Sequence, residues 1–224
     1  MSFEIKPVAH IESDFDSKFG IPRQSGLIEE LEAKIVFEPE FRNKEAIRGI
    51  EGYSHIWLIW QFSENIRSEW APTVRPPRLG GNTRVGVFAS RSPFRPNSLG
   101  LSCVRLERVE EDKEQGSVII VKGADLMNGT PIFDIKPYLP YSDCVIEARE
   151  GYAPKPLESL KVVFSEETED TITGEKKTAL IKMLSYDPRP HYQDDPERVY
   201  GFKFAGYEVK FKVSEDTLTV LEIE

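Results

Sequence analysis

Alternation of apolar and polar residues with a period of two recurs along the first 140 residues. The alternating segments are rich in β-branched and aromatic side chains, which is typical of half-buried β-strands. The pattern predicts strands at residues 3–11, 55–62, 84–89, 101–109, 117–122 and 131–135. Turn sequences such as LGGN and NGTP separate them, and helical periodicity is sparse. Short strands joined by such turns favour a barrel or a sandwich over a fold in which strands and helices alternate.

The segment HIWLIWQF, residues 55–62, is almost continuously hydrophobic. This predicts a central strand that is covered on both faces.

The pattern changes after Pro140. Residues 151–159, GYAPKPLES, carry two prolines and a glycine, as a linker between domains does. We therefore predict two domains, 1–150 and 151–224. In the second we expect a helix at 178–186 and strands at 161–164, 199–204, 207–213 and 217–223, which together make a small α+β domain.

Composition limits the classes of function. The chain of 224 residues has a formal net charge of −9, and 39% of its residues are hydrophobic. No apolar run approaches the roughly 20 residues of a membrane helix, and residues 1–15 lack the features of a secretory signal. Two cysteines and three histidines are widely spaced in the sequence, which argues against a metal site. We expect a cytoplasmic protein with neither a membrane span nor a metal.

One segment departs from the acidic average. Residues 67–95 hold six arginines against one acid, Glu69, a net charge of +5. Four prolines between positions 76 and 96 fix backbone φ, so the guanidinium groups stand on stiff loops. A guanidinium presents a planar donor fork to phosphate or carboxylate and can stack on a base. The segment is predicted to bind an anion; the alternative is a solvated loop whose arginines pair with surface acids.

Short motifs do not identify a reaction. The sequence lacks GxGxxG, GxxxxGK[ST], HExxH and GxSxG, which excludes the commonest nucleotide and hydrolase sites. The residues alone indicate a rigid site for anionic or polar ligands beside a β-barrel, with RNA as one candidate.

Longer sequence segments indicate a specific family. The chain resembles the TsaA-like family in PRQSG (22–26), EGYSHIWLIW (51–60), TVRPPRLGGN (73–82), GVFASRSPFRPNSLGLS (86–102), DLMNGTPIFDIKPYLPY (125–141) and DPRP (187–190). These segments stand in family order and span essentially the whole chain. Ser63 and Ser98 depart from the family pattern, at positions where histidine and proline are common, respectively.

The resemblance implies a mainly β protein, in which a single-sheeted antiparallel β-barrel binds S-adenosylmethionine and a small α+β C-terminal domain follows. It also implies a homodimer with cofactor sites near the subunit interface. The implied reaction is methyl transfer to the exocyclic nitrogen of threonylcarbamoyl-adenosine, on the 3′ side of the anticodon in a threonine tRNA. The threonylcarbamoylated tRNA is thus the implied partner.

The resemblance also implies roles for individual residues. The cofactor would be bound by Arg23, Gln24, Ser25, Ser63, Glu64, Arg91, Leu101, Ala124, Asp125 and Leu126. Asp125 or Glu64 would bond ribose hydroxyls or the methionyl ammonium, and Arg91 would meet the carboxylate. The tRNA would be contacted by Arg75, Arg78, Arg84 and Arg95. The DPRP turn, with His191 and Tyr192, would either complete the substrate pocket or only end a helix.

A proton acceptor is harder to predict, because methyl transfer to nitrogen depends mainly on in-line positioning. Asp134 and Tyr138, with His55 behind them, are candidates for proton removal or for orienting the base. A structural hydrogen-bond role for Asp134 and a core position for His55 are the alternatives. Two other functions stay open for the whole chain: a cofactor- or RNA-binding module without turnover, and a methyltransferase for another small substrate.

Overall fold

The computed structural model describes residues 3–66, 69–154, 160–189 and 195–224. Arg67, Pro190, His191 and Tyr192, for which the sequence suggested roles, lie outside the described residues. Residues 155–159 of the expected linker lie outside them as well.

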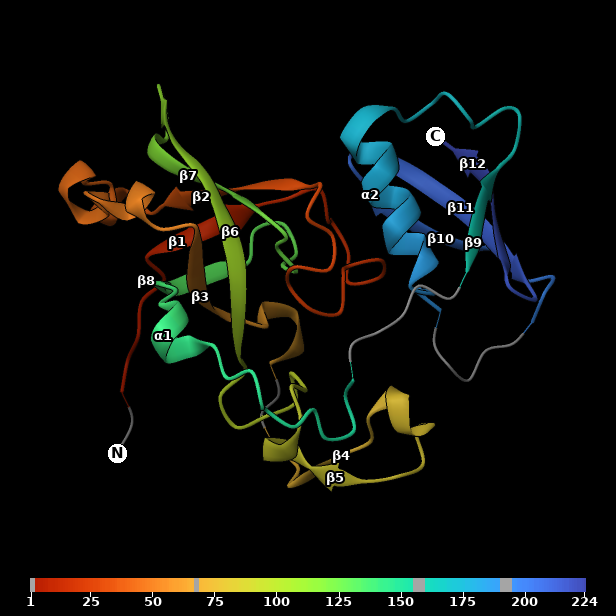
Figure 1. The fold of residues 1–224 in the computed structure, drawn as a ribbon, viewed down its shortest axis with the longest axis horizontal. Helices are drawn as coiled ribbons and strands as arrows, with labels where there is room; N and C mark the ends of the chain where they lie inside the picture. Colours follow the sequence, from red (N-terminus) through yellow and green to blue (C-terminus); the bar gives the residue numbers. More distant parts are fainter. Residues whose placement is uncertain (1–2, 67–68, 155–159, 190–194) are drawn as a thin grey trace.

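Six strands close into an antiparallel barrel in the order β1-β2-β7-β6-β3-β8 (Figure 1). They are β1 (Ala9–Glu12), β2 (Glu32–Phe37), β3 (His55–Gln61), β6 (Leu99–Asp112), β7 (Gly116–Lys122) and β8 (Pro131–Pro137). The ladder between β1 and β8 closes the ring, with Ala9 opposite Ile132. Helix α1 (Pro140–Asp143) follows β8.

Side-chain alternation builds the barrel core. On β3, Ile56 and Leu58 are completely buried and Trp60 nearly so, whereas the residues between them are half-buried. The expectation of a strand covered on both faces is therefore wrong. Strand β6 leaves room for the Trp60 indole at Gly100, where an added Cβ would lie 2.3 Å from the ring.

Four further strands form a separate sheet in the order β10-β11-β12-β9. Their bounds are β9 (Lys161–Phe164), β10 (Tyr200–Phe204), β11 (Tyr207–Ser214) and β12 (Thr217–Ile223). β12 and β9 run parallel, and the other pairs are antiparallel. Helix α2 (Gly174–Ser185) packs on this sheet through the buried Leu180 and Leu184. The predicted strands and helix of this part are confirmed to within a few residues at their ends.

The segment between β1 and β2 joins the two parts of the molecule. Phe15, Ile28 and Leu31 belong to the core of the C-terminal sheet. At Gly20, φ is +91° and a Cβ would lie 2.5 Å from the Phe202 ring, so only glycine fits there. The Gly26 N–H donates to the Gly123 carbonyl of the barrel over 2.8 Å. The loop that carries PRQSG is thereby held between the barrel and the C-terminal sheet.

A third, two-stranded sheet pairs β4 (Thr73–Val74) with β5 (Val85–Gly86), below the barrel in Figure 1. Single-turn 3-10 helices punctuate the connections, at Pro39–Phe41, Lys44–Ile47, Ile50–Gly52, Ser63–Asn65, Pro77–Leu79 and Val87–Ala89. Of the predicted strand at 84–89, only Val85 and Gly86 are in a strand, and the rest of that prediction is wrong. The mainly β class is confirmed. The barrel is a single sheet, but the described residues also form the C-terminal sheet and this two-stranded sheet, of which only the C-terminal one was expected.

Candidate functional site

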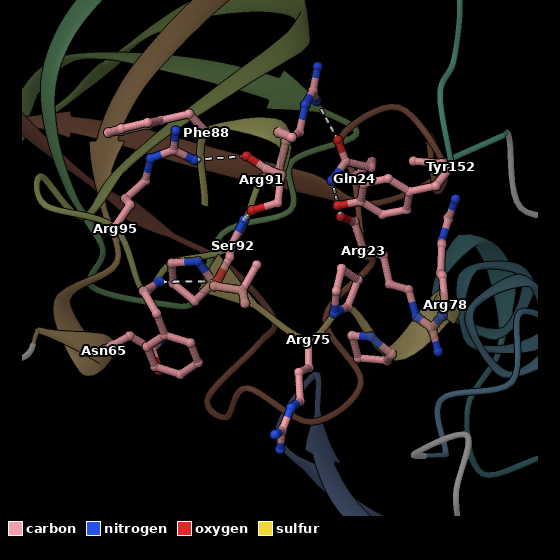
Figure 2. A pocket seen from close by; sticks show the side chains of 18 of the residues that line it. Arg23, Gln24, Asn65, Arg75, Arg78, Phe88, Arg91, Ser92, Arg95 and Tyr152 are labelled. Carbon is pink, nitrogen blue, oxygen red and sulfur yellow. Dashed lines mark hydrogen bonds between the residues drawn. The ribbon is translucent and has the colours of Figure 1, made fainter. Parts of the chain in front are cut away.

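A cavity of about 2380 Å³ opens where three parts of the chain meet. One wall is the 18–27 loop, a second is made by residues 65–98 around β4 and β5, and a third comes from residues 149–154 and 188–189. Figure 2 shows Phe88 and Arg95 toward one end of the cavity and Arg78 and Tyr152 toward the other. Segments far apart in the sequence therefore share one site.

The cavity collects eight of the predicted site residues. Arg23, Gln24, Ser25 and Arg91 from the predicted cofactor set line it, and so do Arg75, Arg78, Arg84 and Arg95 from the predicted tRNA set. Sequence reasoning assigned these residues to two ligands, and the fold places them around one space.

Three guanidinium groups of the cavity, those of Arg78, Arg91 and Arg95, donate hydrogen bonds to uncharged oxygen atoms. The Arg78 guanidinium donates to the Pro154 carbonyl, and that of Arg95 donates to the Ser90 carbonyl over 3.1 Å. The Arg91 guanidinium donates to the side-chain oxygen of Gln24 (Figure 2). Carbonyl partners orient a guanidinium without cancelling its charge, so these groups can still bind an anion.

Arg23 lies near a second cation of the cavity, Arg78. The Arg23 guanidinium donates to the Asp187 carbonyl over 3.3 Å. Burial, together with the nearby Arg78, lowers the pKa of Arg23 from its ordinary value, and Asp187 opposes that shift. An anionic ligand placed beside Arg23 and Arg78 would relieve this repulsion.

Asp125 lies behind the 22–26 loop, at the end of a buried hydrogen-bond chain. The Trp60 indole N–H donates to Ser102 Oγ over 2.9 Å, and Ser102 Oγ donates to Asp125 Oδ1 over 2.5 Å. Burial raises the pKa of Asp125 to about 6, although the bond from Ser102, backbone N–H groups including that of Ser25, and the charge of Arg91 act in the opposite direction. This carboxyl group is thus held next to Ser25 and Arg91 with its pKa raised by burial.

The other predicted cofactor residues, Ser63, Glu64, Leu101, Ala124 and Leu126, do not line the cavity. Ser63 and Glu64 belong to a 3-10 helix whose last residue, Asn65, lines the cavity. The side chains of Ala124 and Leu126 are part of the barrel core, so only their backbone groups can reach a ligand. Leu101 points outward from β6 and is 54% exposed.

Asp134 and Tyr138 do not line the cavity. Asp134 pairs with Lys136 over 2.9 Å on β8, and Tyr138 packs against the rings of His55 and Trp57. Burial, and secondarily Cys144, raises the pKa of the Tyr138 phenol. Their catalytic roles stay predictions.

Sequence reasoning missed several lining residues, including Trp70, Phe88, Arg149 and Tyr152. Trp70 and Phe88 lie within the arginine segment, residues 67–95, and large aromatic side chains in such a polar segment were the available signal. Residues 149–154 of the third wall reach the cavity through tertiary contacts that local sequence patterns do not report. From the DPRP turn, Pro188 and Arg189 line the cavity, and Arg189 pairs with Asp187 over 2.9 Å.

The described residues, 3–66, 69–154, 160–189 and 195–224, offer neither a metal centre nor a membrane-spanning helix. Within these ranges, no group of three or more His, Cys, Asp or Glu side chains is arranged to hold a metal ion. No helix among them is long and apolar enough to cross a bilayer.

Comparisons with known proteins identify the family. The model of the tRNA-methyltransferase O N-terminal domain matches residues 10–144, and that of the TrmO C-terminal domain matches residues 157–224. The tRNA (adenine(37)-N6)-methyltransferase of Escherichia coli (strain K12) is 38% identical over 233 residues, covering 100% of this chain and 98% of that protein. A putative S-adenosylmethionine-dependent methyltransferase of Pseudomonas aeruginosa is 37% identical, with 100% and 98% covered.

A solved structure agrees with these sequence matches. The crystal structure of TrmO from Pseudomonas aeruginosa superposes with a TM-score of 0.81 at 32% identity, covering 100% of this chain and 99% of that one. The resemblance noted from the sequence is confirmed, and the chain belongs to the tRNA-methyltransferase O family.

Proposed function

We propose that the protein is an S-adenosylmethionine-dependent methyltransferase that acts in the cytoplasm on the exocyclic nitrogen of threonylcarbamoyl-adenosine, next to the anticodon of a threonine tRNA. S-adenosylhomocysteine is the by-product. The observation that carries the proposal is the convergence of the predicted cofactor loop and the predicted tRNA arginines on one cavity. Family membership supports the same reaction class.

The cofactor fits the chemistry of the groups behind the 22–26 loop. S-adenosylmethionine has a carboxylate, an ammonium and two ribose hydroxyls, and it supplies the methyl group when bound. Arg91 would hold the carboxylate, oriented by its bond to Gln24. Asp125 would accept hydrogen bonds from the hydroxyls or the ammonium, while Ser102 fixes the position of its carboxyl group.

The remaining predicted contacts have defined parts in this proposal. Backbone groups of Ala124 and Leu126 would read the adenine, because their side chains are buried in the barrel. Glu64, whose carbonyl accepts from Lys18 over 2.8 Å, would approach the cofactor from the adjoining 3-10 helix with Ser63.

The positive charge of the cavity also suits the proposed methyl acceptor, threonylcarbamoyl-adenosine in tRNA. Threonylcarbamoyl-adenosine carries a carboxylate, and the neighbouring nucleotides carry phosphates. Arg75 and Arg84 are exposed at the cavity, and no hydrogen bond or ion pair involves their side chains within the part of the chain that the structure describes. They are therefore available for phosphate, while the carbonyl-bound Arg78 and Arg95 offer preoriented donor forks.

Catalysis by this chain would rest mainly on positioning. Holding a nitrogen nucleophile and a methyl carbon in line supplies a large part of the rate acceleration of such a transfer. Four prolines of the second wall, Pro76, Pro77, Pro93 and Pro96, fix backbone φ there, and this favours that arrangement. Asp134 and Tyr138 remain our candidates for accepting the proton or orienting the base.

A homodimer is part of the proposal. Leu101, a predicted cofactor contact, is exposed on the outer face of the barrel, and Tyr141, Val145 and Ile146 after β8 are at least 66% exposed. A second copy packed on this surface would cover these apolar side chains and bring Leu101 to a cofactor site of the partner.

Methyl transfer from labelled S-adenosylmethionine to tRNA tests the proposal. Label in the threonylcarbamoyl-adenosine supports it. Cofactor binding without any transfer would favour a module without turnover, and transfer to a small molecule alone would favour a different substrate.

A further inference from the structure

Two aromatic rings stand exposed at the cavity and belong to none of the apolar cores of the described residues. Trp70 is 53% exposed and Phe88 is 73% exposed. Their ring centroids lie 6.3 Å apart with an interplanar angle of 35°. Both side chains line the cavity. Large aromatic side chains in water lose the free energy that burial would give them, so a paired, exposed set indicates a ligand.

The backbone around this pair is fixed. Strands β4 and β5 pair Thr73 with Gly86 and Val74 with Val85. Beyond the end of this ladder, the Val87 N–H donates to the Pro72 carbonyl over 2.9 Å. Trp70 precedes β4 and Phe88 follows β5, so both rings lie just beyond the same end of this ladder.

The chemistry around the rings defines the ligand. The exposed Arg75 and Arg84 flank the same hairpin, Arg95 lies near Phe88 at this end of the cavity (Figure 2), and Glu69 is the acid beside Trp70. A ligand with a flat apolar face and an attached negative charge matches this surface. An unpaired nucleotide has both, since its base stacks on an aromatic ring while its phosphate meets arginine.

We propose that Trp70 and Phe88 form a stacking platform for an unpaired base of the tRNA anticodon loop, next to the base that is methylated. This inference rests on the proposed function, and it adds a site that recognises single-stranded RNA. A base-paired nucleotide cannot use the platform, because its faces are already stacked within the helix.

The test compares two RNA probes of the same composition, a hairpin with a seven-nucleotide loop and a fully paired duplex. Dissociation constants are measured by fluorescence anisotropy at several salt concentrations. Trp70→Ala and Phe88→Ala are each expected to weaken hairpin binding about tenfold, since one stacked base contributes roughly 1–3 kcal/mol. The salt slope stays unchanged, because no phosphate contact is lost. Duplex binding stays as in the wild type.

Control variants separate stacking from general effects. Trp70→Phe keeps an aromatic face and is expected to retain most of the hairpin affinity. Phe3→Ala removes another exposed aromatic side chain, 82% exposed, and is expected to change nothing. Thermal unfolding curves of Trp70→Ala and Phe88→Ala should match the wild type because both side chains are exposed.

Several outcomes would overturn the platform. One is that both alanine variants bind the hairpin with wild-type affinity, and another is that they lose equal affinity for the hairpin and the duplex. A third is a changed sedimentation coefficient with unchanged RNA affinity, which would make the two rings a contact between copies of the chain. Methyl transfer by the wild type to threonylcarbamoylated tRNA is measured in parallel. Transfer together with normal binding by the alanine variants refutes the platform alone, whereas a wild type that neither binds RNA nor transfers methyl refutes both proposals.

Discussion

Asp125→Asn should make the protein more stable at neutral pH and less able to bind its cofactor. The pKa of Asp125 is raised from 3.8 to about 6, chiefly by burial. The folded state therefore binds the proton more tightly than the unfolded state does. The stabilisation from this group is complete below about pH 3.8 and is lost as the pH rises through about 6. At pH 8 the ionised carboxylate costs about 3 kcal/mol relative to its neutral form.

The asparagine variant removes this cost while its side-chain oxygen can still accept the bond from Ser102. The free energy of unfolding of Asp125→Asn, minus that of the wild type, should thus increase by about 3 kcal/mol between pH 3 and pH 8. With a urea m-value near 3 kcal/mol/M, the midpoint difference changes by roughly 1 M. Urea titrations followed by tryptophan fluorescence measure it.

Asp112→Asn provides a control of opposite sign. The backbone N–H groups of Gln115 and Glu114 lower the pKa of Asp112, so its ionised form stabilises the folded state. The wild type should gain stability over Asp112→Asn as the pH rises from the lowered pKa of Asp112 to about 3.8, and the gain should be complete above that pH. A stability difference between Asp125→Asn and the wild type that is the same at pH 3 and pH 8 would refute the reasoning about burial at Asp125.

Three other predictions concern binding and turnover. Arg91→Ala should raise the dissociation constant of S-adenosylmethionine at least tenfold, as the loss of a charge-assisted hydrogen bond costs roughly 1.5–3 kcal/mol; an unchanged calorimetric titration would remove Arg91 from the site. The double change of Arg78 and Arg95 to alanine should weaken tRNA binding and flatten its salt dependence while cofactor affinity stays near wild type, and an unaltered salt slope would contradict the RNA face. A proton-transfer role for Asp134 or Tyr138 requires that Asp134→Asn or Tyr138→Phe lower kcat by roughly 100-fold without altering either dissociation constant; kcat at the wild-type level would exclude that residue.

Local sequence patterns predicted most strands because the alternation of apolar and polar residues lies within each strand itself. Strands β9 and β12 begin and end at the predicted residues, and β3 and β7 differ from the prediction by one residue at one end. Strand β2 was missed because EAKIVF has little alternation: its last three residues are all buried. Residues 84–89 alternate like a strand, yet only Val85 and Gly86 find a partner.

Tertiary placement was the part that the pattern could not supply. Phe15 and Ile28 read as ordinary apolar residues of the N-terminal half, and only the fold shows that they pack under the C-terminal sheet. The arginine segment was recognisable because charge and proline are visible in the sequence. The convergence of Arg23, Arg91 and Tyr152 on one cavity depends on contacts between segments more than 60 residues apart.

Labelled methyl transfer to two tRNA preparations tests the central claim most directly, one preparation carrying the threonylcarbamoyl group and the other lacking it. Each reaction contains the same protein and labelled S-adenosylmethionine. The tRNA is then digested to nucleosides, which are separated and identified by mass spectrometry. We predict label in the threonylcarbamoyl-adenosine of the first preparation and none in the second. Equal labelling of both preparations, or no label although calorimetry shows that the cofactor binds, would contradict the account.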